Sequence, residues 1–240
     1  MPSIDLILPC YNPQENWEQL ILSSLKEINQ LSPDLQIHVI LVNDGSTPPL
    51  NPDCIQTLRD QIPHFTFIDN TINRGKGYVL RDGVAQSEDQ ICMFTDVDFP
   101  YTLDSFIDVY ESLLADDCAV AVGIRNTSYY SQTPLARKII SKVFKKLIKT
   151  FFRLKVSDTQ CGLKGFNAEG RKLFLQTTID RYLFDLEFIQ LASRKFPKQI
   201  KGVTVELKEG IVFSKINTKI LLQEGGSFMK IFLGSIFRKK

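Results

Sequence analysis

Histidine is scarce in this sequence, because only His38 and His64 occur among 240 residues. With so few imidazoles a histidine-based zinc site is implausible, and no serine–histidine–aspartate arrangement stands out. The five cysteines are odd in number, widely spaced and without a C-x-x-C pair, a usage that agrees with a cytoplasmic setting. Any chemistry in this chain must therefore use carboxylates, backbone amides and basic side chains.

Long hydrophobic runs are also missing. No apolar stretch reaches the ~18–20 residues that a membrane-spanning helix needs. The N-terminal sequence MPSIDLILPCYN lacks the basic start and long apolar stretch of a secretory signal. The composition, with 43% hydrophobic and 23% charged residues, is that of a folded protein with a full core. No internal repeat or linker interrupts the chain, so we expect a single domain, residues 1–240.

Short apolar runs alternate with helical patterns through the first half of the chain. The sequence predicts strands at 4–8, 37–42, 65–68, 91–95 and 119–124, and helices at 15–28, 77–86 and 102–114. In the second half it predicts helices at 134–153 and 184–195, a strand at 200–207, and an apolar and basic segment at 220–240. This alternation is typical of an α/β fold with a Rossmann-like, mostly parallel sheet and helices on both faces.

Polar residues follow three of the predicted strands, at the point where each strand ends. Asn12, Asp44 and the pair Asp96 and Asp98 all fall just past a carboxyl end. In open α/β sheets the ligand binds at the carboxyl ends of the strands. We therefore expect these residues to converge on one site.

The tripeptide Asp96-Val97-Asp98 places two carboxylates in the turn that leaves a predicted buried strand. Two hard oxygen ligands suit Mg²⁺ or Mn²⁺, which proteins hold with one or two carboxylates plus substrate phosphates. Such a cation neutralises a nucleotide-diphosphate leaving group. The alternative is that an Asp in this turn caps the following helix. The position after an apolar strand, with Asp44 at an equivalent strand end, favours a metal site.

The segment Asn73-Arg74-Gly75-Lys76-Gly77 leads into a predicted helix. Free amides at the helix N-terminus, together with Arg74 and Lys76, favour an anion there. The G-x-x-x-x-G-K spacing of a Walker A motif is absent, and no G-x-G-x-x-G follows the first strand, which counts against a dinucleotide oxidoreductase. The Asp44 side chain can accept hydrogen bonds from a base or ribose, and its alternative role is an Asx-turn.

The segments LPCYNP (8–13), LVNDGS (41–46), NRGKG (73–77) and FTDVD (94–98) occur in the order and spacing of a known family. They resemble the inverting glycosyltransferases of family 2, which have a GT-A fold and use nucleotide-diphosphate sugars with a divalent metal. DTQCGLKGF (158–166) and FDLEF (184–188) look like the dolichyl-phosphate mannose and glucose synthase branch. The resemblance covers roughly residues 3 to 190.

The resemblance implies a donor site in residues 1–125 and an acceptor half in residues 126–240. It implies that the base and ribose meet the loop 9–12 and Asp44, that the ribose or diphosphate approaches Asp96, and that Asp98 carries the metal. The expected donor-site residues are Pro9, Tyr11, Asn12, Asp44, Gly75, Lys76, Asp96 and Lys215. Relatives in the mannose branch often carry a Gln two residues after the second Asp, where this chain has Pro100. They also often continue into transmembrane helices, so a separate transmembrane partner is a further expectation.

A basic segment occupies residues 118–157, which hold nine positive charges and no acidic residue. At ~100° per residue, six of these side chains fall in one helical arc, opposite a broad apolar face. They are Lys138, Lys142, Lys145, Lys146, Lys149 and Arg153. This pattern predicts a helix in an anionic membrane surface, with lysines at headgroup level. A core helix with a solvated lysine face fits equally well, whereas nucleic acid is disfavoured because no recognition module is present.

Arg137 interrupts the apolar arc of that helix, on the same face as Ser141. A guanidinium in an apolar face favours an anionic partner. In the lipid-phosphate branch, residues similar to Arg137, Ser141 and Arg125 contact the acceptor phosphate. We therefore expect a catalytic set of Asp98, Arg125, Arg137 and Asp185.

These features favour the inverting transfer of a hexose from a UDP- or GDP-sugar to a polyprenyl phosphate at the cytoplasmic face of a membrane. An ionised phosphate attacks without strong base help, whereas a sugar-hydroxyl acceptor requires a carboxylate base. Asp158, Asp185 and Glu187 are the candidates for that base. Polysaccharide synthesis on a sugar hydroxyl, and an idle membrane-binding module of the same fold, remain the alternatives.

Overall fold

The computed structural model describes residues 2–115, 117–126, 135–152, 154, 156, 158–209 and 218–237. Seven strands lie in this described part. They are β1 (Ser3–Cys10), β2 (Gln36–Asp44), β3 (Phe65–Asn70), β4 (Ile91–Phe94), β5 (Val120–Arg125), β6 (Lys164–Asn167) and β7 (Ile200–Val205). They form one sheet in the order β3-β2-β1-β4-β6-β5-β7.

The direction of the strands brings most carboxyl ends to one edge of this sheet. β1 pairs in parallel with β2 and β4, β2 pairs in parallel with β3, and β5 pairs in parallel with β7. Only β6 runs the other way, antiparallel to both β4 and β5. Its first residue, Lys164, therefore starts beside Phe94, where β4 ends. The sheet is α/β, mixed and mostly parallel, as the sequence predicts.

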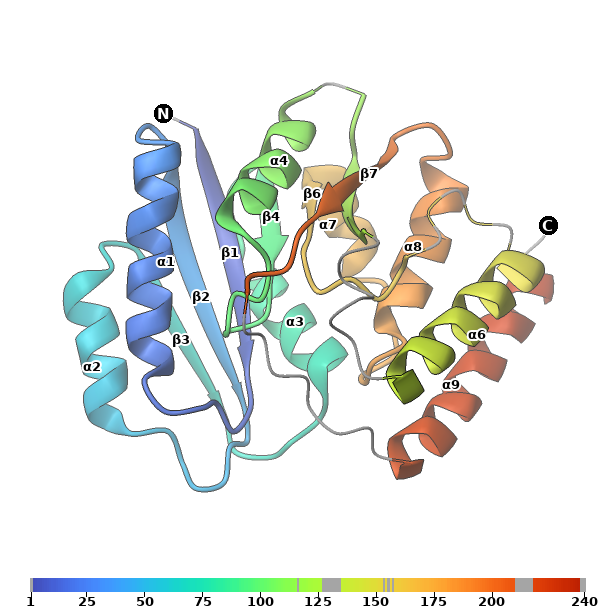
Figure 1. Ribbon diagram of the computed structural model, residues 1–240, viewed down its shortest axis with the longest axis horizontal. Helices are drawn as coiled ribbons and strands as arrows, with labels where there is room; N and C mark the ends of the chain where they lie inside the picture. Colours follow the sequence, from blue (N-terminus) through green and yellow to red (C-terminus); the bar gives the residue numbers. More distant parts are fainter. Residues whose placement is uncertain are drawn as a thin grey trace.

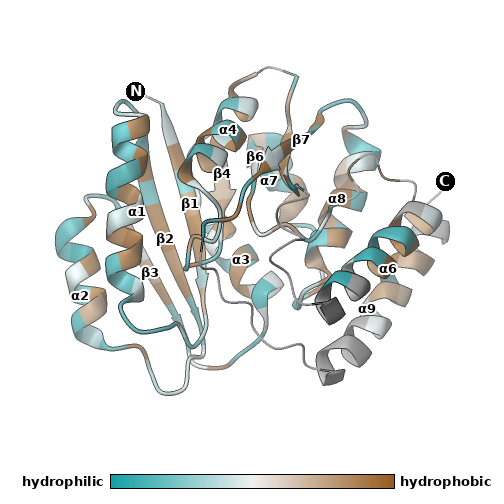
Figure 2. Ribbon diagram, in the orientation of Figure 1, coloured by the Kyte–Doolittle hydropathy of each residue, from teal (hydrophilic) through white to brown (hydrophobic). Residues whose placement is uncertain are grey.

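Helices cover both faces of the sheet (Figure 1). One face packs against α1 (Trp17–Leu31), α2 (Pro52–Gln61) and α4 (Leu103–Leu114), and the other against α3 (Lys76–Ala85), α7 (Ala168–Phe174) and α8 (Phe184–Lys195). Side chains alternate along β1, because Leu6 and Leu8 enter one core cluster and Ile7 the other. The central strands are hydrophobic along their length because both faces are covered (Figure 2).

The remaining helices, α6 (Leu135–Phe152) and α9 (Thr218–Phe237), lie side by side at one end of the molecule (Figure 1). Phe151 and Phe152 of α6 pack edge to face against Phe228 and Phe232 of α9, with ring centroids 5.2 to 6.3 Å apart. None of the described helices combines the length and the apolar character that crossing a membrane requires.

Three elements were not predicted from the sequence. α2 buries only Ile55 and Leu58, so its helical pattern is weak. β6 has four residues and begins with a lysine, and α7 follows it directly. The other strands and helices lie at or within a few residues of the predicted ranges, except that α9 occupies a segment predicted only as apolar and basic.

Candidate functional site at the carboxyl edge of the sheet

Asp96 and Asp98 leave the end of β4 in a tight turn. The N–H of Phe99 donates to the carbonyl oxygen of Asp96 at 2.9 Å, and Phe99 is buried with a φ of 41°. A positive φ is unusual for a bulky residue and marks a backbone held by its surroundings. The turn leaves Asp98 exposed at the edge of the sheet. Lost hydration and the like charge of Asp96 together raise the pKa of Asp98.

Asp96 is held from two sides. Its carboxylate forms an ion pair with the Nζ of Lys76, the first residue of α3. On the other side lies Gly162, where a Cβ would stand 2.6 Å from Asp96 Oδ2. Burial lowers the pKa of Lys76, but Asp96, Asp185 and Asp98 outweigh it and raise that pKa overall. Acidic and basic groups therefore alternate along this edge.

The acidic pair fits a divalent cation only in part. Within the described residues, no group of three or more His, Cys, Asp or Glu side chains could hold a metal ion. Asp96 and Asp98 offer carboxylate oxygens, and Mg²⁺ is commonly bound by one or two carboxylates plus substrate phosphates. The residues present therefore suit a metal that is shared with a diphosphate.

Asp44 holds the loop that carries Lys76. Its carboxylate accepts hydrogen bonds from the N–H of Arg74 at 2.7 Å, from the N–H of Gly75 at 3.0 Å and from Asn73 Nδ2 at 3.0 Å. Burial raises the pKa of Asp44, and the backbone hydrogen bonds oppose this. Asp44 thus positions the start of α3, whatever further contact it makes with a ligand.

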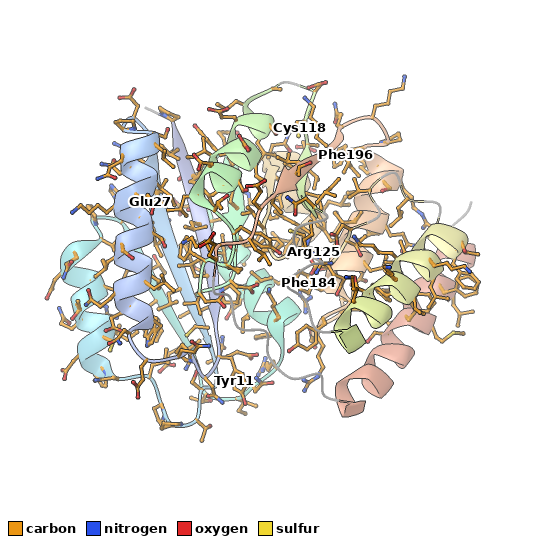
Figure 3. The ribbon with its side chains drawn as sticks, viewed as in Figure 1. Tyr11, Glu27, Cys118, Arg125, Phe184 and Phe196 are labelled. Atoms are coloured by element: carbon orange, nitrogen blue, oxygen red, sulfur yellow. The ribbon has the colours of Figure 1, made fainter. Side chains whose placement is uncertain are left out.

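The loop after β1 forms the neighbouring part of the edge. The N–H of Asn12 donates to Ser46 Oγ at 2.9 Å, and Asn12 Oδ1 accepts from the N–H of Thr47 at 2.7 Å. Pro9 lies within β1, opposite Val42. Tyr11 is 51% exposed just past the end of β1 (Figure 3), so its ring is open to stacking with a planar ligand.

Arg125 ends β5 and is bound to the fully buried carboxylate of Asp158. The backbone N–H and Nε of Arg125 donate to Asp158 Oδ2 at 3.1 and 2.9 Å, and Lys145 Nζ of α6 donates to the same oxygen at 3.0 Å. Burial alone would raise the pKa of Asp158, but Arg125 and Lys145 hold it below its usual value. Figure 3 shows Arg125 between the sheet and α6. The prediction that Lys145 lies at headgroup level with the other lysines is therefore wrong.

Asp185, at the start of α8, pairs with a lysine that was not singled out from the sequence. Lys164 is fully buried, and its Nζ donates to Asp185 Oδ1 at 2.6 Å and to the carbonyl oxygen of Cys161. Burial raises the pKa of Asp185, while Lys164 and Lys76 oppose this. The segment DTQCGLKGF carries Lys164, so that motif was the available signal.

Glu187, the third carboxylate considered as a base, is also engaged. It accepts from the N–H and Oγ1 of Thr178 at 2.8 and 2.9 Å, and from the N–H of Ile179 at 2.9 Å. The carbonyl oxygen of Ile179 packs so close to Gly77 that a Cβ there would stand only 2.4 Å from it. Glu187 therefore orders a loop that packs against the start of α3.

The described structure places the predicted donor-side residues of the first half of the chain along one edge of the sheet. The segment 158–162 connects this edge to Arg125, because Asp158 pairs with Arg125 and Gly162 lies against Asp96. Ser141 lies on α6 and is partly buried. Four predicted residues cannot be compared, because Lys215, Arg153 and the side chains of Arg137 and Lys149 lie outside the described residues.

Comparisons with known proteins identify a family for this sequence. A sequence model described as "Glycosyl transferase family 2" matches residues 5–174. The dolichyl-phosphate beta-glucosyltransferase of Dictyostelium discoideum is 26% identical over 205 residues, covering 80% of this chain and 62% of the relative. The enzyme of that name in Homo sapiens is 25% identical over 206 residues, covering 79% and 62%. The chain thus spans less than two thirds of the length of these relatives.

Solved structures support the fold. Mannosyl-3-phosphoglycerate synthase from Rubrobacter xylanophilus has a TM-score of 0.73 at 11% identity and covers 99% of this chain and 75% of its own. Mannosyltransferase PcManGT from Pyrobaculum calidifontis, in complex with GDP-Man and Mn²⁺, has a TM-score of 0.62 at 15% identity, covering 100% and 65%. At these identities the likeness concerns the fold alone.

Proposed function

Because the chain belongs to glycosyltransferase family 2, we propose that this hexosyltransferase transfers a hexose, with inversion, from a nucleotide-diphosphate sugar to a polyprenyl phosphate. The relatives named as dolichyl-phosphate beta-glucosyltransferases favour glucose and a dolichyl-like acceptor. The observation that carries the proposal is the edge after β4, where Asp96 and Asp98 lie beside Lys76 and the start of α3.

The donor half of the reaction requires that the departing nucleoside diphosphate be stabilised. Mg²⁺ or Mn²⁺, when held by Asp96 and Asp98, would supply positive charge to the diphosphate. Lys76 and the positive end of the α3 helix dipole add to this field. Asp44 keeps these groups in place through the loop 73–75. Tyr11 and Asn12 would meet the base and ribose.

The acceptor half favours a phosphate over a sugar hydroxyl. A phosphate monoester has a second pKa near ~6 and is largely ionised at neutral pH, so it attacks without a strong base. A hydroxyl acceptor needs a free carboxylate base. Asp158, Asp185 and Glu187 are each engaged with N–H, O–H or ammonium donors. Arg125 at the end of β5, with Arg137 and Ser141 of α6, would bind the acceptor phosphate.

A membrane surface is the expected location of a polyprenyl phosphate, and α6 and α9 are suited to one. Val143 and Leu147 of α6, and Met229 and Leu233 of α9, expose between 38% and 53% of their area. Lys142, Lys146 and Lys230 are also exposed on these helices. Exposed apolar side chains beside lysines match an anionic bilayer surface. We therefore propose peripheral binding at the cytoplasmic face of a membrane.

A transfer assay tests the proposed reaction. Purified protein is incubated with UDP-glucose or GDP-mannose, Mn²⁺ and either dolichyl phosphate or a free sugar acceptor, and the lipid-linked product is extracted and counted. We expect a lipid-linked hexose that Asp98→Asn abolishes. Asp108→Asn, which changes an exposed aspartate in the middle of α4, is the matched control and should leave the rate unchanged. Transfer only to the free sugar would support polysaccharide synthesis, and no transfer at all would support an idle module.

A further inference from the structure

The segment after β7 returns to the turn that carries the acidic pair. The N–H of Thr102 donates to the carbonyl of Glu206 at 2.9 Å, and the N–H of Lys208 donates to the carbonyl of Pro100 at 2.9 Å. Tyr101 and Leu207 form an antiparallel bridge between these two bonds. Figure 1 shows the chain running from β7 toward the lower end of the central strands. The backbone of Lys208 is thus hydrogen-bonded to Pro100, which comes two positions after Asp98 in the sequence.

The side chain of Lys208 lies over the turn itself. Its Nζ is 5.8 Å from the centroid of the Phe99 ring, and Phe99 is buried with a positive φ. The ring therefore holds the ammonium group near Asp98 by a cation–π contact. Glu27 of α1 also contributes to the field at Lys208.

Lys208 differs from the other lysines of this region in its pairing. Lys76, Lys145 and Lys164 each form an ion pair with an aspartate. Lys208 is half-buried, yet it forms no ion pair with any residue of the described part of the chain. Burial lowers the pKa of Lys208, and Glu27 and Asp98 only partly oppose this. A half-buried cation without a direct counter-ion is costly, so an anionic ligand would stabilise it.

We propose that Lys208 binds the diphosphate of the nucleotide donor on the Asp98 side of the site, while Lys76 acts on the Asp96 side. This inference rests on the proposed function, because it assumes a nucleotide-diphosphate donor. The two lysines come from opposite halves of the chain, and the bonds between residues 100–102 and 206–208 bring Lys208 close to Asp98. Lys208 would then lower the energy of the departing diphosphate by adding charge beside the metal ligands.

Lys208→Met removes the charge and keeps the length of the side chain, and the backbone N–H that bonds to Pro100 remains. Lys208→Arg keeps the charge. The matched control is Lys201→Met, which removes a partly exposed lysine of β7 that pairs with Asp117. All variants are first compared with the wild type by thermal unfolding, so that a loss of fold is recognised.

The test is the affinity for UDP and for GDP, measured by calorimetry in Mn²⁺. We expect Lys208→Met to weaken the tighter of the two nucleotides by about 10- to 100-fold, the range for one hydrogen bond to a charged group. Lys208→Arg and Lys201→Met should stay within about twofold of the wild type. If Lys208→Met binds the nucleotide as tightly as the wild type, or if Lys208→Arg loses as much affinity as Lys208→Met, the inference is wrong while the proposed function still stands. A wild-type protein that binds neither nucleotide would overturn the proposed function as well.

Discussion

Lys145 Nζ lies 3.0 Å from the carboxylate of Asp158, and this contact ties α6 to the end of β5. Asp158 also binds Arg125, so one buried carboxylate joins the predicted acceptor residue of the sheet to the basic helix. Nine residues separate β5 from α6, and the Asp158 side chain connects the two elements. The proposed acceptor side therefore contains a cluster of charged groups, and its members can be tested separately.

The first prediction concerns Asp158. Asp158→Asn removes the negative charge that Arg125 and Lys145 share, and losing one partner of a buried pair costs ~3–5 kcal/mol of unfolding free energy at pH 7. Because the folded pKa of Asp158 is lowered, its stabilisation is present above the unfolded value of ~3.9 and is lost as the pH falls through the folded value. Urea unfolding from pH 7 to pH 3 should show the wild-type advantage shrinking below pH ~4. An advantage that grows on acidification would contradict this assignment.

The second prediction separates Lys145 from its neighbours on α6. Lys145→Gln should lower the unfolding free energy by ~1.5–3 kcal/mol, because it removes a hydrogen bond to a charged, buried partner. Lys142→Gln and Lys146→Gln change exposed side chains and should stay within ~0.5 kcal/mol. Their effect should appear instead in binding to anionic vesicles, at ~1 kcal/mol per lysine. Equal destabilisation by all three would show that the Asp158 contact contributes nothing.

The third prediction concerns the space beside Asp96. A Cβ at position 162 would stand 2.6 Å from Asp96 Oδ2, so Gly162→Ala must displace that carboxylate. A shift of ~1 Å in a positioned group can cost ~100-fold in rate, and we expect a fall of this order in hexose transfer. Gly225→Ala is the control, because a Cβ there meets nothing within 4 Å. Unchanged transfer by Gly162→Ala would show that the position of Asp96 is unimportant.

The fourth prediction tests the membrane surface. Val143→Gln combined with Leu147→Gln removes two exposed apolar side chains from one face of α6, and burying such side chains contributes ~1.5–3 kcal/mol each. Binding to anionic vesicles, measured by flotation, should fall at least about tenfold. Leu31→Gln combined with Leu114→Gln removes two exposed leucines elsewhere and should have no effect. If the two double variants float with the vesicles to the same extent, α6 does not contact the membrane.

Much of the fold could be predicted because the first half of the chain follows simple patterns. The apolar runs of β1 and β2 are buried on both faces, and each is followed by a polar turn. β6 was not predicted, because its fully buried Lys164 departs from the apolar pattern of a core strand. Its charge is accommodated by Asp185, which lies 21 positions along the chain. A pattern of neighbours cannot reveal such a partner.

The placement of part of the candidate site could be predicted in the same way. Asp44 ends β2, and Asp96 and Asp98 follow β4 within four residues, so the ends of these parallel strands bring them to one edge. The spacing on α6 could not show that Lys145 leaves the lysine arc, since its partner Asp158 lies outside the helix. The position of Lys208 beside the turn of Asp98 could not be predicted, because it depends on hydrogen bonds between residues 100–102 and 206–208.

The binding of Mn²⁺ tests the central claim, that the carboxylates after β4 share a cation with the diphosphate of the donor. Mn²⁺ affinity is measured by electron paramagnetic resonance, with and without UDP or GDP, for the wild type and for Asp98→Asn. We predict that the nucleotide tightens Mn²⁺ binding to the wild type by at least about tenfold, a typical coupling between two sites, and that Asp98→Asn loses this effect. Mn²⁺ binding that ignores the nucleotide, or that survives unchanged in Asp98→Asn, would contradict the claim.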